Sequence, residues 1–89
     1  MKKLLILFFL SITIVSSANL YGVIFKGASL IEADLRQADL SKADLTLANL
    51  TGANLTNANL TGAKLEGAIL DSALFCNTRT PWGIDNSGC

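Results

Sequence analysis

A five-residue period runs through the chain from Ala18 to Asn77 and constrains its fold more than any other feature. Every fifth residue from position 20 to position 75 is Leu or Phe: ten leucines plus Phe25 and Phe75, without exception in twelve positions. Two residues before each of these lies Ala, for which Val23 is the only substitute. The fold must therefore bury one large and one small apolar side chain in every pentapeptide.

The common regular elements cannot satisfy this period. On an α-helix a five-residue step rotates the side chain by about 140° and scatters the leucines around the whole cylinder. On a straight strand five is an odd step, so successive leucines would point to opposite faces. A coiled-coil seam needs a mean spacing of about 3.5 residues. The period therefore excludes a helical bundle and a flat sheet.

A chain that bends by about a quarter turn every five residues does place all these side chains inside. Four such sides make a square coil of about 20 residues, and stacked coils pair backbone to backbone at roughly 4.8 Å, which satisfies the main-chain polar groups. The sequence thus predicts an all-β fold in which equivalent residues of successive coils lie in columns.

The tandem pattern Ala-(Asp/Asn)-Leu-x-x, as in Ala53-Asn54-Leu55-Thr56-Asn57, resembles the pentapeptide-repeat family. The resemblance extends without a break from Ala18 to Asn77. It implies a right-handed quadrilateral parallel β-helix of about three coils, which we assign to residues 19–77.

The N-terminus has the pattern of a secretory signal peptide. Lys2 and Lys3 precede an apolar stretch from Leu4 to Val15, and Ser16-Ser17-Ala18 offers small residues for cleavage after Ala18. About a dozen apolar residues are fewer than the roughly 20 that a membrane-spanning helix needs. We therefore expect a signal-peptide helix over residues 1–18, export to a periplasmic, secreted or equivalent lumenal compartment, and no stable membrane span after cleavage; retention of the segment as an anchor is the alternative.

Residues 78–89 form a tail outside the repeat, with turn signals at Pro81 and Gly83. An exported chain with two cysteines favours a disulfide, here between Cys76 and Cys89. Trp82 is then expected to cover the end of the lumen. Two cysteines without a histidine fall short of the four ligands of a usual zinc site.

The positions flanking the core residue have expected structural roles. Asp and Asn before the Leu suit a corner at which their side chains bond nearby backbone, and glycines two after it suit turns. Asp34, Asp39 and Asp44 fall on three different sides, which speaks against a shared cation site. Asp44 is expected to pair with Lys64 one coil further on, in an exposed contact worth at most about 1 kcal/mol.

Outward-facing apolar residues are the candidate interaction surface: Tyr21, Ile24, Ile31, Leu47 and Trp82. The first coil could bind a protein partner or a second copy through an open N-terminal end, because solenoid ends expose core and strand edges. The alternative is that its aromatic residues fold over a ragged end.

No residue constellation in the chain indicates catalysis, a cofactor or a metal. After the signal peptide the chain has five basic and seven acidic residues. This slightly negative charge does not indicate nucleic-acid binding. We therefore expect a non-enzymatic exported module that acts as a structural or protein-interaction scaffold. Two alternatives are a DNA-mimicking inhibitor of a DNA topoisomerase, as among longer members of the family, and a self-associating structural rod.

Overall fold

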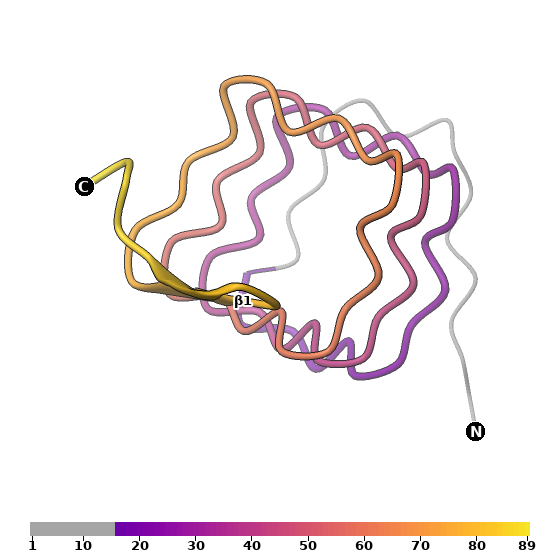
Figure 1. Ribbon diagram of the computed structural model, residues 1–89, viewed down its shortest axis with the longest axis horizontal. Helices are drawn as coiled ribbons and strands as arrows, with labels where there is room; N and C mark the ends of the chain where they lie inside the picture. Colours follow the sequence, from indigo (N-terminus) through magenta and orange to yellow (C-terminus); the bar gives the residue numbers. More distant parts are fainter. Residues whose placement is uncertain (1–15) are drawn as a thin grey trace.

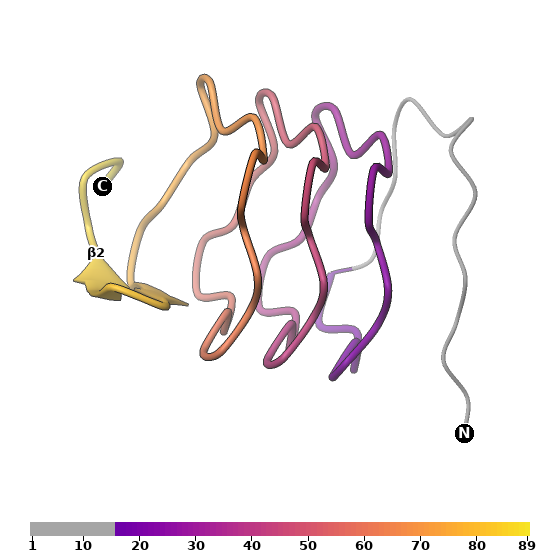
Figure 2. The ribbon, with the colours of Figure 1, turned by 45° about the vertical axis from the view of Figure 1, so that its right-hand side comes forward.

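The chain winds into square coils, which Figures 1 and 2 show as stacked loops from indigo to orange. The computed structural model describes residues 16–89. The expected signal-peptide helix lies, up to residue 15, outside the described residues. Within residues 16–89 there is no helix, and hence none long and apolar enough to cross a membrane.

Parallel backbone bridges join equivalent residues of successive coils along the described chain, from Asn19 with Asp39 to Asn59 with Arg79. The predicted columns are thereby confirmed. We number the coils as residues 18–37, 38–57 and 58–77, and the four sides of each coil by successive pentapeptides. In the third coil, for example, the second side is 63–67 and the third side is 68–72.

A tight turn ends every side. The Ala53 N–H donates to the Leu50 C=O at 3.0 Å, and the same bond recurs at each corner from Leu20–Val23 to Leu70–Ala73. At the last corner the Phe75 C=O accepts the Gly88 N–H instead. The residue two after the Leu, here Gly52, has a positive φ of 71°. A positive φ at the second central residue only is the geometry of a type II turn, which favours Gly or Asn at that place. The glycines that the sequence places two after the Leu suit this conformation, and at the other corners residues such as Lys42, Leu47 and Asn57 adopt the same positive φ.

Between the turns, backbone hydrogen bonds connect adjacent coils. The Asn49 N–H donates to the Ala28 C=O at 2.9 Å, while the Leu50 N–H donates to the Ile69 C=O at 2.8 Å. Each side is so short between its two turns that it contributes an isolated bridge and not an extended strand. The predicted parallel β-helix is thus correct in its pairing, whereas its sides are too short to be β-strands.

Alanine and leucine side chains fill the lumen. The inward residues of the second coil are 0–1% exposed: Ala38, Leu40, Ala43, Leu45, Ala48, Leu50, Ala53 and Leu55. Most of their outward neighbours are half-buried or exposed. A lumen filled in this way leaves no room for a ligand, so binding by residues 16–89 must involve the outer walls or the ends of the stack.

Two short strands form the tail: β1 (Thr78–Thr80) and β2 (Gly83–Asp85), which pair antiparallel across a Pro81-Trp82 turn. Arg79 also bridges to Asn59, so the coil continues to Thr80, past the end at Asn77 that the sequence predicted. Thr78 takes the inward place of an Ala, is fully buried, and donates its hydroxyl to the Leu55 C=O at 2.7 Å. That hydrogen bond is what allows a polar residue to continue the inward column.

Candidate interaction surfaces

The Asp and Asn residues that directly precede a Leu form corner hydrogen bonds. The Asn54 Oδ1 accepts the Thr56 N–H at 3.1 Å and the Thr56 hydroxyl at 2.7 Å. The same bond to the N–H two residues on is accepted by Asn19, Asp34, Asp39, Asp44, Asn49 and Asn59. These side chains therefore stabilise the turns, as the sequence predicted.

Within residues 16–89, one ion pair forms, between Asp34 and Arg36. Arg36 donates through Nε at 2.7 Å and through Nη2 at 2.6 Å, and these side-chain hydrogen bonds lower the pKa of Asp34. The pair is open to solvent, so screening leaves it a small contribution to stability.

The expected contact between Asp44 and Lys64 is wrong as an ion pair. Their backbones bridge, yet the Asp44 Oδ1 accepts the Thr46 N–H at 3.1 Å. Hydrogen bonding from Thr46 is the main cause that lowers the pKa of Asp44, and the charge of Lys64 contributes less. The turn therefore holds the carboxylate close to its own corner.

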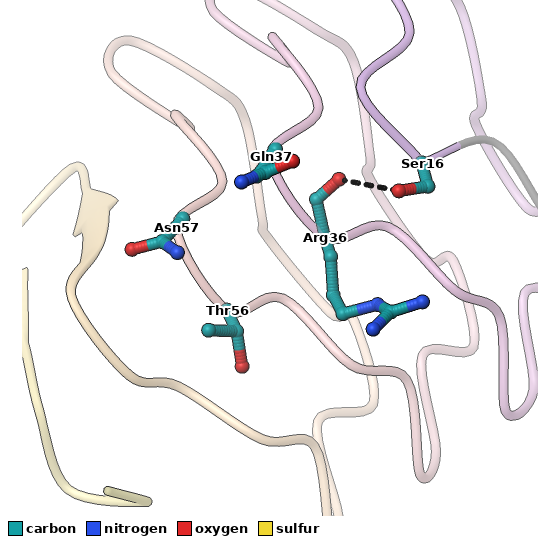
Figure 3. Close-up of a pocket in the computed structure, with 5 residues that line it drawn as sticks. All are labelled: Ser16, Arg36, Gln37, Thr56 and Asn57. Carbon is teal, nitrogen blue, oxygen red and sulfur yellow. Dashed lines mark hydrogen bonds between the residues drawn. The ribbon is translucent and has the colours of Figure 1, made fainter.

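An open polar depression lies on the outer wall, along the corner at which the fourth side of each successive coil ends (Figure 3). Its lining consists of Ser16, Arg36, Gln37, Thr56 and Asn57. The Ser16 hydroxyl donates to the Arg36 C=O at 3.2 Å, and the Arg36 guanidinium is held by Asp34. The lining is polar and contains no histidine, aspartate, glutamate or cysteine.

The apolar residues singled out in the sequence do not form one surface. Tyr21 and Ile24 are exposed around one corner of the first coil, and Ile31 is half-buried on its third side. Leu47 is 60% exposed at the corner between the second and third sides of the second coil. Trp82 is exposed on the tail, at the other end of the stack from Tyr21.

Two exposed apolar residues were not among the predicted ones. Ile69 and Ile84 are 43% and 62% exposed. The signal for Ile69 is its place directly before a Leu, where Asp or Asn would form the corner bond. Ile84 lies in β2, outside the repeat, so the period carries no information about it.

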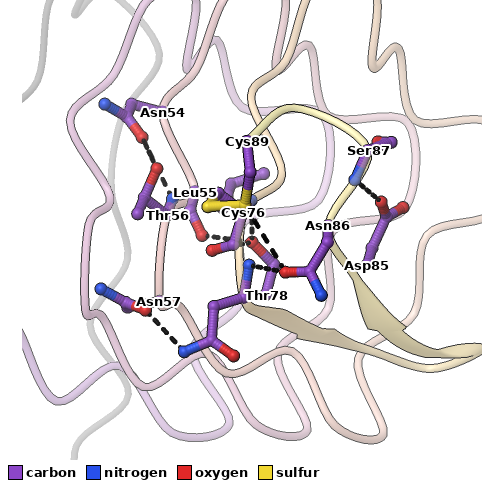
Figure 4. The surroundings of a disulfide bond; sticks show 11 residues. Asn54, Leu55, Thr56, Asn57, Cys76, Thr78, Asp85, Asn86, Ser87 and Cys89 are labelled. Carbon is purple, nitrogen blue, oxygen red and sulfur yellow. Dashed lines mark hydrogen bonds between the residues drawn. A yellow bond between two sulfur atoms is a disulfide. The ribbon is translucent and has the colours of Figure 1, made fainter.

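The tail is held against the end of the third coil (Figure 4). Cys76 and Cys89 are joined in a disulfide, with their Cα atoms 4.9 Å apart. The Gly88 N–H donates to the Phe75 C=O at 2.7 Å, and the Asn77 N–H donates to Asn86 Oδ1 at 2.6 Å.

The Trp82 ring meets Phe75 edge to face, with ring centroids 6.2 Å apart. Gly88 lies against the Leu74 side chain beside it. The tail thus covers the first and fourth sides of the third coil.

Stacked square coils with an alanine-leucine lumen define a four-sided β-solenoid. The family model described as pentapeptide repeats matches residues 16–52 with 8 copies. The chain belongs to the pentapeptide-repeat family, which implies the right-handed β-helix.

Solved structures of pentapeptide-repeat proteins resemble the chain. HetL, which is involved in heterocyst differentiation regulation in the cyanobacterium Nostoc sp. strain PCC 7120, is 33% identical over 79% of this chain and 39% of HetL, with a TM-score of 0.45. A protein of the Arabidopsis thaliana thylakoid lumen is 41% identical over 73% of this chain and 49% of that protein, with a TM-score of 0.39.

Rfr23 from the cyanobacterium Cyanothece 51142 is 32% identical over 67% of this chain and 51% of Rfr23, with a TM-score of 0.30. The chain thus spans between 39% and 51% of the length of these three proteins. Among curated proteins there is no significant match.

Proposed function

We propose that the chain is an exported, non-enzymatic module whose outer walls and ends bind another protein. The observation that carries this proposal is the filled lumen: Leu35, Leu40, Leu45, Leu50 and Leu55 are all 0% exposed. Catalysis requires a concave site with convergent reactive groups. A small polar depression and isolated apolar residues on flat walls are instead suited to contact with a macromolecule.

The charge of the walls favours a protein partner over nucleic acid. Residues 16–89 carry five basic and seven acidic side chains, and the bridged columns mix both signs, as in Asp44 and Lys64. A DNA mimic depends on a long, continuous negative surface, and three coils at about 4.8 Å give a rod of only about 15 Å. The interaction role is therefore better supported than inhibition of a topoisomerase.

Site-specific photocrosslinking in the producing cells tests the proposal. A photoreactive amino acid in place of Tyr21, and a second variant with it in place of Trp82, sample the two ends of the stack, and the same group at Thr61 samples a polar wall as a control. We expect crosslinks to one exported protein from at least one end and none from Thr61. Crosslinks to cytoplasmic proteins alone would overturn export, and silence at all three positions would overturn the interaction role.

The same experiment can also show that the partner is a second copy of the chain. Self-association through Tyr21 and Ile24 would give a crosslinked band of twice the mass and a concentration-dependent mass in light scattering. A monomer at high concentration would remove the structural-rod alternative and leave binding to another protein.

A further inference from the structure

The C-terminal end of the third coil is covered on only two of its four sides. The tail lies against the first and fourth sides through Arg79, Gly88 and the disulfide. The second and third sides, residues 63–72, have nothing stacked on them among residues 16–89. We call residues 63–72 the open rim.

The second coil shows what covers this position elsewhere in the molecule. Its residues 43–52 form six backbone hydrogen bonds with 63–72: Leu45 N–H to Lys64 C=O, Leu47 to Glu66, Leu50 to Ile69, Gly52 to Asp71, Lys64 N–H to Ala43 C=O, and Ile69 to Ala48. At the open rim the equivalent groups have no partner within residues 16–89: the N–H groups of Leu65, Gly67, Leu70 and Ser72, and the C=O groups of Ala63 and Ala68.

Burial changes in the same way between the two coils. Leu45 and Leu50 are 0% exposed, whereas the equivalent Leu65 and Leu70 are only half-buried. Exposed Ile69 lies on the same rim, and the Leu47 side chain lies directly over Gly67. The open rim therefore combines an unpaired parallel edge with an uncovered apolar strip, and both features favour pairing with a further chain segment.

We propose that the open rim binds an extended segment of another protein that follows the same five-residue pattern, Ala-x-Leu-x-x-Ala-x-Leu. The segment adds as a half coil, by β-strand addition. A straight strand matches one side only, because the rim turns a corner at Gly67, where φ is 72°. A segment with this pattern turns at the same place and continues the six-bond interface already present between 43–52 and 63–72.

The tail argues against a whole second solenoid end as the occupant. The hairpin of β1 and β2 lies beyond the third coil, at the left of Figure 2. Two such ends brought face to face would meet at their hairpins, whereas a single segment fits next to one. This inference rests on the proposed interaction function and specifies the partner's chemistry.

The test uses the oxidised full chain and a synthetic peptide that copies residues 63–72, Ala-Lys-Leu-Glu-Gly-Ala-Ile-Leu-Asp-Ser, capped at both ends. This peptide is the segment that covers the equivalent rim of the second coil. We expect it to slow hydrogen exchange of the Leu65, Gly67 and Leu70 amides, measured by NMR, and to leave amides of the first coil unchanged. A scrambled peptide should have no effect.

N-methylation of the peptide provides a matched pair. Its second residue corresponds to Lys64, whose N–H donates to the preceding coil at 2.9 Å, so methylation there removes a bond to the rim. Its third residue corresponds to Leu65, whose N–H points away from the preceding coil. We expect the first modification to weaken binding about tenfold, the loss of one buried hydrogen bond, and the second to weaken it much less.

Equal effects of the two methylations, or no protection at millimolar peptide, would overturn the proposal. Rim protection that rises with protein concentration without peptide would also overturn it and would identify a second copy as the occupant. Crosslinks from Tyr21 to a partner together with a silent rim would leave the proposed function intact and refute this inference alone.

Discussion

Replacing Leu50 by Ala tests whether the lumen of the stack is a packed core. Leu50 is 0% exposed and lies between Leu30 and Leu70 in one column. The substitution removes three carbons, which costs about 2.4 kcal/mol in transfer free energy at about 0.8 kcal/mol for each buried carbon. The cavity adds about 1 kcal/mol, because close turns on every side limit relaxation. We expect the free energy of unfolding to fall by about 3–4 kcal/mol.

Leu70→Ala is the matched control at the same repeat position. Leu70 is only half-buried, and the cavity opens to solvent at the end of the coil. We therefore expect about half the loss, roughly 1–2 kcal/mol. Urea unfolding of both variants with the disulfide intact, followed by circular dichroism, gives the difference from the midpoints at a common m-value. Equal losses at the two positions, or a loss below about 1 kcal/mol for Leu50→Ala, would refute the packed lumen.

Three further predictions concern the tail, the corners and pH. Replacing Cys76 and Cys89 together by Ser should lower the free energy of unfolding by about 3 kcal/mol, and an unchanged urea midpoint would contradict a tail held by the disulfide. Gly27→Ala should cost about 1 kcal/mol, because φ is 70° and no atom lies within 4 Å of the added Cβ; a neutral result would contradict the left-handed corner. Stability should be flat between about pH 5 and 8, since there is no histidine. The pKa values of Asp34, Asp44 and Asp85 are lower in the folded chain than the value of about 3.9 for an unfolded Asp. The free energy of unfolding should therefore decline as the pH falls below about 3.9 and these carboxylates become protonated. A loss of stability centred near about pH 6 would contradict this assignment.

The five-residue period was sufficient to predict the coil itself. Only a chain that bends by a quarter turn every five residues buries all the Leu and Ala side chains. The columns, the bridges between successive coils and the corners therefore follow from the spacing. The corner bonds of residues such as Asn54 also follow, because a short polar side chain at that place has one backbone N–H within reach. These features depend on local sequence alone.

The ends of the stack could not be predicted in the same way. Thr78 continues the inward column although it is polar, because its hydroxyl reaches the Leu55 C=O in the preceding coil. Thr78 breaks the repeat pattern because it is polar where Ala is expected. The hydrogen-bond acceptor that compensates for its polarity becomes apparent only in the folded coil. Asp44 and Lys64 show the same limit: their columns were predicted, whereas the competing bond to Thr46 was not.

The candidate surfaces also differ in how far the sequence predicts them. Exposure of Tyr21, Ile24 and Leu47 follows from their places in the pentapeptide, whereas Ile84 lies outside the repeat and could not be predicted from it. The open rim depends on where the tail lies, and that is set by the contacts of Gly88 and the disulfide. The Ala and Leu positions in 63–72 are the same as in the covered 43–52, so the core pattern does not show which segment lies at the end of the stack.

Scalar couplings across hydrogen bonds, measured by NMR on the labelled full chain, test the stacked square coil most directly. The coil predicts that the Leu50 amide nitrogen couples to the carbonyl carbon of Ile69 in the next coil, and that Leu45 couples likewise to Lys64. Couplings from each amide to the carbonyl one helical turn earlier in the chain would indicate an α-helix. That result, or the absence of any coupling from one coil to the next, would contradict the fold.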